Sequence, residues 1–200
     1  MYFDALTLAA VADELRATVV GGRVQRALLP SPLSVALEVY AGHRRHHLLL
    51  SAHPRLARAH LIDARPSRGV EAQTPLLLLL RKYVVRGWIV AVEQPALERV
   101  LVLSIAKRPP KRNTDEPEPP EADELEDEQD HAAPAHDDDD MLRCELVLEA
   151  MDQRSNIVLV GDDNIILGAA RVVTPRMSRR PVLPHGPYEL CLLYTSPSPR

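Results

Sequence analysis

Near the start of the chain, apolar residues recur at three- and four-residue steps, the spacing that places side chains on one face of a helix. Between residues 5 and 20 these positions are Leu6, Leu8, Val11, Leu15 and Val19. Asp4 precedes the segment and can accept hydrogen bonds from the free amides of a first helical turn. Gly21 and Gly22 follow it, and glycine ends a helix because it adopts the left-handed cap without steric cost. We therefore expect a helix over residues 5–20.

The pattern then changes to alternating polar and apolar residues, which is typical of half-buried strands. Four such segments follow one another at residues 22–30, 34–40, 45–51 and 57–63. The tetrapeptide AGHR stands between the second and the third segment and predicts a hairpin turn. This part of the chain is therefore expected to be a helix followed by an antiparallel meander.

A second helix is expected from Thr74, a suitable N-cap, to Gly87, with Pro75 at the first helical position. Its leucine run surrounds most of the helix circumference, so we expect the helix to be buried. The remaining segments read as strands at 88–94 and 99–106, a strand or short helix at 142–151, a hairpin at 156–160 and 164–170, and an extended stretch at 172–188. The expected fold class is α+β, with mostly antiparallel β lobes and two helices.

Charge is distributed unevenly along the chain, although the net charge is only −4. Residues 115–140 hold 14 of the 28 acidic side chains and no Lys or Arg, which leaves 14 acidic against 24 basic side chains elsewhere. Residues 107–140 also carry six prolines and few apolar residues. Such a segment cannot offset a backbone entropy of about 1–2 kcal/mol per residue. We expect a disordered acidic insert in a basic domain, and a basic domain favours polyanionic partners.

These changes in composition divide the chain into four parts. Residues 1–106 and 141–190 form the two parts of one domain, and residues 107–140 are its acidic, Pro-rich insert. The last ten residues, CLLYTSPSPR, resemble the translation of a sequencing-library adapter. We interpret residues 191–200 as such an artefact, which would make the chain a truncated fragment.

Several classes of protein are disfavoured by the sequence. The longest stretch without Asp, Glu, Lys or Arg has 11 residues, whereas a membrane span needs about 20 apolar residues. The first residues lack the basic start of a signal peptide, and the two cysteines are too few for a disulfide framework, so the cytoplasm is the expected location. We expect no cofactor, because no phosphate-binding Gly loop or nucleophile elbow is present. We expect no metal, because His43, His46 and His47 stand among arginines without a carboxylate or Cys partner.

Six segments, in this order and spacing, resemble the N-terminal domain of the NFACT family. This family includes the fibronectin-binding protein A group and ribosome quality control factors of the RqcH type. The segments are FDAL, ELRATVVGGRVQRALLPSP, LLLSAHPRLARAHL, TPLLLLLRKYVVRGWIVAVEQPALERV, LEAMDQRSNIVLV and RRPVLPHGPY, which together span most of residues 1–190.

The resemblance implies a fold related to the N-terminal lobe of formamidopyrimidine-type DNA glycosylases. Tyr2 stands where those enzymes have a proline nucleophile, so glycosylase chemistry is not expected. The implied function is a tRNA- and large-ribosomal-subunit-binding module of a factor that adds C-terminal alanine tails to stalled nascent chains. Its partners would be the large ribosomal subunit carrying peptidyl-tRNA, and alanyl-tRNA, with no membrane and no catalytic residue of its own. A fibronectin-binding surface adhesin is the alternative.

The resemblance also points to candidate binding residues. Glu98 and Arg99 match the Asp-Arg pair of the family; in a strand they would face opposite sides, one anchoring the domain and one facing a ligand. The motif MDQRSN departs from the family pattern M-G-R-H-S-N, and Asp152 in place of Gly matters if that backbone needs a positive φ. Arg154, Ser155 and Asn156 could hold RNA backbone or shape a turn. Further arginines are expected to form a polyanion-binding surface, and those assigned to the site are Arg176, Arg179 and Arg180.

Overall fold

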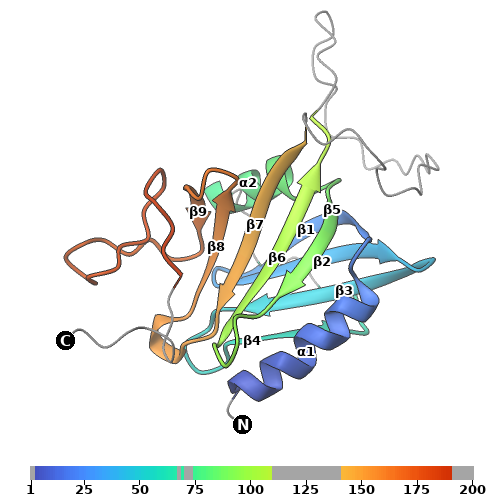
Figure 1. Ribbon diagram of the computed structural model, residues 1–200, viewed down its shortest axis with the longest axis horizontal. Coiled ribbons are helices and arrows are strands. Elements are labelled where there is room, and N and C mark those ends of the chain that lie inside the picture. Colours follow the sequence, from blue (N-terminus) through green and yellow to red (C-terminus); the bar gives the residue numbers. More distant parts are fainter. Residues whose placement is uncertain (1–2, 67–68, 70–73, 110–140, 191–200) are drawn as a thin grey trace, which may run out of the picture.

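The computed structural model describes residues 3–66, 69, 74–109 and 141–190 (Figure 1). Two α-helices lie within these residues, α1 (Ala5–Thr18) and α2 (Pro75–Tyr83), together with a short 3-10 turn, η2 (Asp152–Arg154). The strands are β1 (Arg23–Ser31), β2 (Ser34–Ala41), β3 (Arg44–Ser51), β4 (Arg58–Ile62), β5 (Trp88–Glu93), β6 (Val100–Lys107), β7 (Leu142–Glu149), β8 (Asn156–Gly161) and β9 (Ile166–Ala169). The expected α+β class with a mostly antiparallel sheet and two helices is confirmed. The relation to a glycosylase lobe stays a prediction.

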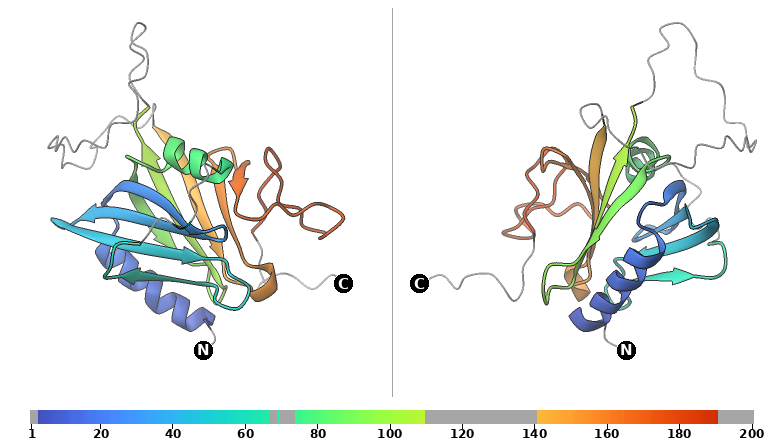
Figure 2. Two further views of the ribbon diagram at one scale, coloured as in Figure 1. Left: turned by 180° about the vertical axis from the view of Figure 1, so that it is seen from behind. Right: turned by 45° about the vertical axis from the view of Figure 1, so that its right-hand side comes forward.

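All the described strands belong to one sheet in the order β4-β3-β2-β1-β5-β6-β7-β8-β9, and all neighbours are antiparallel. β1 and β5 share a single register pair, Arg23 with Trp88. The sheet therefore folds over at this junction, and β1–β4 cross behind β5–β9 at a steep angle (Figures 1 and 2). The molecule is thus two β layers, with α1 along one open side and α2 at another.

The main core fills the space between the two layers. Alternate residues of each strand point into it, as in Leu101, Leu103 and Ile105 of β6, while α1 contributes Leu8 and Leu15. A Leu or Ile buried in this way contributes about 1.5–3 kcal/mol. The core is aliphatic, because the chain has one Phe and one Trp. The N-cap of α1 is Asp4, as expected, and its side chain accepts a hydrogen bond from the Thr7 amide at 2.7 Å.

A second apolar cluster lies on the outer face of β6–β9. Val102, Val147 and Val158 line this face, and Val182 and Tyr188 of the C-terminal segment cover it. The sequence predicts an extended segment here, but residues 171–190 fold back on themselves, since Val173 and Val182 form an antiparallel bridge within the segment. The segment is attached beside β9 by the bridge between Ile165 and Pro187 and by backbone hydrogen bonds of Ile166 with residues 185 and 186. It lies against the outer side of the sheet near β8 and β9 (Figure 2).

The structure corrects the expected end and burial of α2, and it agrees with the sequence expectations at two other places. α2 ends at Tyr83 rather than Gly87, and one side of it is not buried, since Leu78 is 47% exposed. Residues 142–149 form a strand, which settles the choice between strand and helix. The β2–β3 turn is as expected: Gly42 and His43 both have positive φ, as in a two-residue hairpin turn.

The described helices include none that is long and apolar enough to cross a membrane. The acidic stretch at 110–140 and the tail at 191–200 lie outside the described residues.

Candidate nucleic-acid interface

The segment between β5 and β6 is a tight turn that ends in Glu98 and Arg99. The Glu98 amide donates to the Pro95 carbonyl at 2.9 Å, which closes the turn. Gln94 ties it to the rest of the fold: its Nε2 donates to the Glu98 carbonyl at 2.7 Å and to the Ala5 carbonyl of α1 at 2.9 Å. Leu97 has a φ of 61°, an uncommon conformation for a bulky side chain that costs on the order of 1–3 kcal/mol. The turn is therefore held in one shape from several sides.

Glu98 and Arg99 lie just before β6, and their side chains have different surroundings. Glu98 is fully buried, whereas the Arg99 side chain is 16% exposed. Arg99 Nε donates to the Ala150 carbonyl at 2.6 Å, and Nη2 lies 3.1 Å from Asp152 Oδ2. The structure thus gives Glu98 an internal position and leaves part of the Arg99 side chain exposed. Neither residue lies in a strand, because β6 begins at Val100, and the assignment of Arg99 to a ligand stays a prediction.

Asp152 begins the η2 turn and has a φ of 51°, in the left-handed region that favours glycine. The carboxylate of this residue is 67% exposed and is paired with Arg99. A glycine here, as in the family pattern, would leave Arg99 without this acidic partner. The substitution therefore changes both the backbone cost and the charge of the site.

Ser155 and Asn156 shape the turn that follows η2. The Asn156 Oδ1 accepts hydrogen bonds from the amides of Ile157 and Arg171, and its Nδ2 donates to the Arg171 carbonyl, each at 2.9 Å. Ser155 is buried, and its Oγ has no hydrogen-bond partner among the described residues. Asn156 thus anchors the C-terminal segment, while Arg154 is exposed.

The predicted arginines of the C-terminal segment fall into two groups. Arg176 and Arg179 are exposed. Arg180 instead forms a bidentate pair with the buried Glu149, at 2.6 and 3.1 Å, and the Tyr188 hydroxyl donates to the same carboxylate at 2.8 Å. Burial and the nearby Glu149 carboxylate raise the pKa of Tyr188. These contacts give Arg180 a structural role that sequence reasoning missed; a lone Glu in the apolar run LVLEAM was the available signal.

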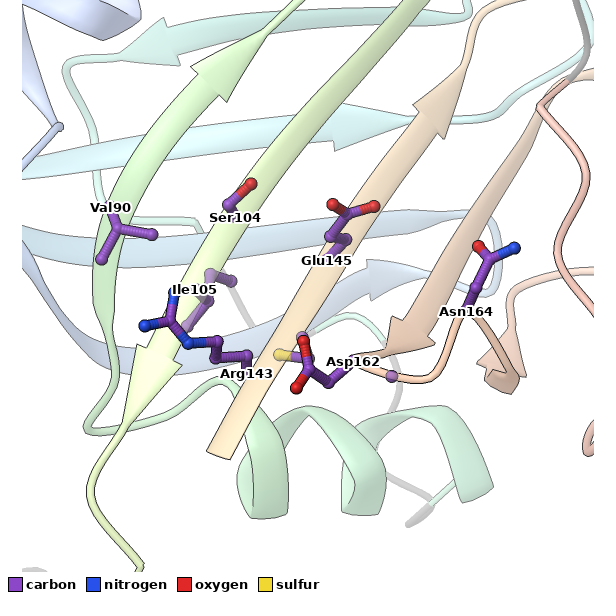
Figure 3. Close-up of a pocket in the computed structure, with 9 residues that line it drawn as sticks. Val90, Ser104, Ile105, Arg143, Glu145, Asp162 and Asn164 are labelled. Atoms are coloured by element: carbon purple, nitrogen blue, oxygen red, sulfur yellow. The ribbon is translucent and has the colours of Figure 1, made fainter. Parts of the chain in front are cut away.

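A pocket of about 240 Å³ lies at the other end of β6 and β7, away from Arg99 (Figure 3). Its polar lining includes Ser104, Arg143, Glu145 and Asp162, which come from β6, β7 and the β8–β9 turn. Burial, followed by the charges of Glu93 and Asp162, raises the pKa of Glu145. The neighbouring Cys144 is a buried thiol whose pKa burial raises to about 12, so it is not a nucleophile at neutral pH. None of the predicted site residues lines this pocket.

In the described part of the chain, no group of three or more His, Cys, Asp or Glu residues lies close enough together to hold a metal ion.

The profile of the NFACT N-terminal and middle domains matches residues 4–197 of this chain. Among curated proteins, the chain is 29% identical over 192 residues to the Rqc2 homolog RqcH of Bacillus subtilis, covering 95% of this chain and 29% of that protein. It is 26% identical over 160 residues to the Rqc2 homolog RqcH of Streptococcus pneumoniae, covering 80% of this chain and 24% of that protein. The chain thus spans less than a third of the length of these relatives.

Two solved structures have the same fold. One is the N-terminal part of the fibronectin/fibrinogen-binding protein from Streptococcus suis, with a TM-score of 0.77 and 24% identity, over 98% of this chain and 63% of that one. The other is the N-terminal domain of the fibronectin-binding protein PavA from Streptococcus pneumoniae, with a TM-score of 0.77 and 24% identity, over 98% and 64%. At this identity the likeness concerns the fold alone.

Proposed function

Because the chain belongs to the family of NFACT N-terminal and middle domains, we propose that it is the tRNA- and large-subunit-binding module of a ribosome quality control factor. The relatives named Rqc2 homolog RqcH support this assignment. The full factor would act on large subunits that carry peptidyl-tRNA in the cytoplasm and would add C-terminal alanines from alanyl-tRNA. The bond-forming chemistry would belong to the ribosome, with this module positioning the tRNA.

The observation that carries the proposal is the position of Arg99. Its Nε is fixed by the Ala150 carbonyl, so the guanidinium has a set orientation. Its Nη2 lies 3.1 Å from Oδ2 of Asp152, whose side chain is exposed. A phosphate oxygen can replace that carboxylate oxygen, since the two outer amino groups of a guanidinium form a planar fork that suits phosphate.

Nearby residues divide into those that bind and those that position. Arg154, Arg176 and Arg179 are exposed and would add phosphate contacts. Glu98 would position the turn that presents Arg99, since its side chain is buried and its backbone bonds with Pro95 and Gln94 close the turn. The set of positioning residues is completed by Ser155, Asn156 and Arg180, whose side chains face the protein interior or other parts of the chain.

The alternative function is a fibronectin-binding adhesin. It is favoured by the titles of the similar solved structures, which name fibronectin or fibrinogen as the ligand of those proteins. Binding of the purified chain to immobilised fibronectin, in the absence of tRNA binding, would favour this alternative.

The test is Arg99→Ala in the full-length protein, with tRNA affinity and alanine addition on purified large subunits as the two readouts. Loss of one charged hydrogen-bonding group should weaken binding by about 1.5–3 kcal/mol, and Arg99→Lys should recover only part of it, because an ammonium lacks the fork. Arg55→Ala, at an exposed arginine between β3 and β4, is the matched control and should leave both readouts unchanged. If Arg99→Ala binds tRNA and adds alanine normally, the assignment of Arg99 to tRNA binding is wrong.

A further inference from the structure

The outer face of β1–β4 carries a group of arginines; this layer is in front in the left view of Figure 2. Residues 23–65 contain seven arginines and no lysine, against two acidic residues, Glu38 and Asp63. In β2, Val35, Leu37 and Val39 point into the core, so Glu38 lies on the opposite, outer face. The same alternation places Arg45 and His47 of β3 on that face, because Leu48 and Leu50 point inward.

Glu38 organises two of these arginines. Its side chain is only 9% exposed, and its two oxygens lie 3.9 Å from the Nε atoms of Arg45 and Arg65, one on each. The two arginine side chains are themselves 56% and 59% exposed. A carboxylate between two guanidinium groups offsets their mutual repulsion, so it holds two cations side by side with a net positive charge.

Two further groups surround Glu38 on the same face. The strand register places Arg26 of β1 opposite Glu38 on one side and His47 of β3 opposite it on the other. His47 Nδ1 is a buried atom without a hydrogen-bond partner in the described part of the chain. Arg26, Arg45, Arg65, His47 and Glu38 are called the β2–β3 arginine patch below.

We propose that the β2–β3 arginine patch is a second phosphate-binding site and that its ligand is the backbone of RNA. Arg45 and Arg65, whose Nε atoms each lie 3.9 Å from one oxygen of the same carboxylate, would contact neighbouring phosphates of one strand. Arginine is the suitable cation here, because its outer amino groups can bind phosphate while Nε stays directed at Glu38. An acidic protein segment would be a weaker match, since its carboxylates lack the regular charge spacing of a nucleic acid backbone.

This inference rests on the proposed function, but it concerns a different layer of the fold. Arg99 lies before β6 in the β5–β9 layer, whereas the patch belongs to β1–β4. Two sites on different layers would contact separate parts of one folded RNA. Their contributions to affinity should then be independent, as is usual for distant sites that share no partner.

The test replaces the carboxylate together with both of its partners, so that no buried charge is left unpaired. The variant is Glu38→Gln with Arg45→Gln and Arg65→Gln, which lowers the net charge by one. Arg55→Gln lowers it by the same amount away from the patch. Affinity for fluorescently labelled tRNA is measured against salt concentration for both. We expect the triple variant to bind roughly tenfold more weakly, with a log–log salt slope smaller by about 1.5–2, as for two lost phosphate contacts; Arg55→Gln should change affinity less than about twofold.

Equal affinities of the triple variant and Arg55→Gln would overturn the proposal. The proposal would also be overturned if the triple variant keeps tRNA binding but no longer binds a poly-glutamate peptide, because the patch would then bind an acidic protein. Should the triple variant not fold, the double variant Arg45→Lys with Arg65→Lys is used, because it keeps the charge and removes the guanidinium fork. An unchanged tRNA affinity of the double variant would overturn the proposal, and a loss of about threefold or more would support it. If Arg99→Ala loses tRNA binding and the triple variant does not, the proposed function stands and the second site is overturned. If the wild-type chain binds no tRNA, the proposed function and the second site are both overturned.

Discussion

The carboxylate of Asp152 lies 3.1 Å from the guanidinium of Arg99, and Asp152 reaches this position with a φ of 51°. The Asp152 carboxylate thus contacts the guanidinium nitrogen of Arg99 to which we assign a phosphate. Asp152 does so in a backbone conformation that favours glycine. The ion pair is exposed on the Asp152 side, so it contributes less than about 1 kcal/mol to stability. Its main expected effect is on ligand affinity, since RNA must displace it.

Asp152→Asn should therefore tighten tRNA binding by about threefold to fivefold, which corresponds to loss of an exposed competing charge. Asparagine tolerates the left-handed backbone, so the fold should not change. The measurement is tRNA affinity at low salt. Asp152→Gly separates the two effects: if charge is the cause, both variants tighten binding equally. In the background of Arg99→Ala, neither should have any effect, and a gain there would show that Asp152 acts elsewhere.

Local patterns were sufficient to predict most of the elements of this fold. The capping residue, the period of the apolar positions and the Gly-His turn located α1 and the meander within one or two residues. Strand order was not predictable, because the single register pair that joins β1 to β5 depends on packing between segments far apart in the chain. α2 was predicted too long, since the sequence continues to be apolar after the helix ends at Tyr83.

The candidate site was predictable only in part. The resemblance located Arg99 and the MDQRSN turn, and the concern about a non-glycine residue at Asp152 is confirmed by its positive φ. Contacts between distant residues could not be predicted. Glu149 with Arg180, and Glu38 with Arg45 and Arg65, are brought together only by the sheet register and the C-terminal segment.

Glu149→Gln should destabilise the domain, because it leaves the Arg180 guanidinium partly buried without its counter-charge. Breaking a buried pair from one side costs about 3–5 kcal/mol, which corresponds to a fall in Tm of roughly 6–20 °C for a domain of this size. Thermal unfolding followed by circular dichroism measures this. An unchanged Tm would show that the pair does not hold residues 171–190 on the sheet.

Glu145→Gln is the matched control on the same face of β7, and it should have the opposite sign. Burial, Glu93 and Asp162 raise the pKa of Glu145, so ionisation of this carboxylate is less favourable in the folded state than in the unfolded state. The free-energy cost of ionising Glu145 in the folded protein is absent at a pH below the pKa that it has in the unfolded chain. The cost is complete at a pH above the raised pKa of the folded state. Because the Glu145 side chain is only partly desolvated, the substitution should raise Tm by no more than a degree or two at pH 7 and should have no effect near pH 3.

Deleting residues 113–140 should leave Tm within a few degrees and should tighten RNA binding. The last register pair of β6 and β7 is Lys107 with Leu142, so the two strand ends already lie side by side and a short loop can join them. Shortening a loop between such ends changes the free energy of unfolding little. The deletion removes 14 acidic residues and no basic ones, which changes the net charge from −4 to +10. Affinity for tRNA should rise on the order of tenfold at low salt, with the gain disappearing at high salt.

A variant of unchanged length, in which the 14 acidic residues between Asp115 and Asp140 are replaced by Asn and Gln, separates charge from loop length. If charge is the cause, this variant should gain as much tRNA affinity as the deletion, because both changes remove the electrostatic repulsion between the RNA and the acidic stretch. The gain should disappear over the same range of salt concentration. A gain for the deletion alone would mean that the stretch obstructs RNA sterically. A large fall in Tm for either variant would mean that residues 113–140 pack against the domain.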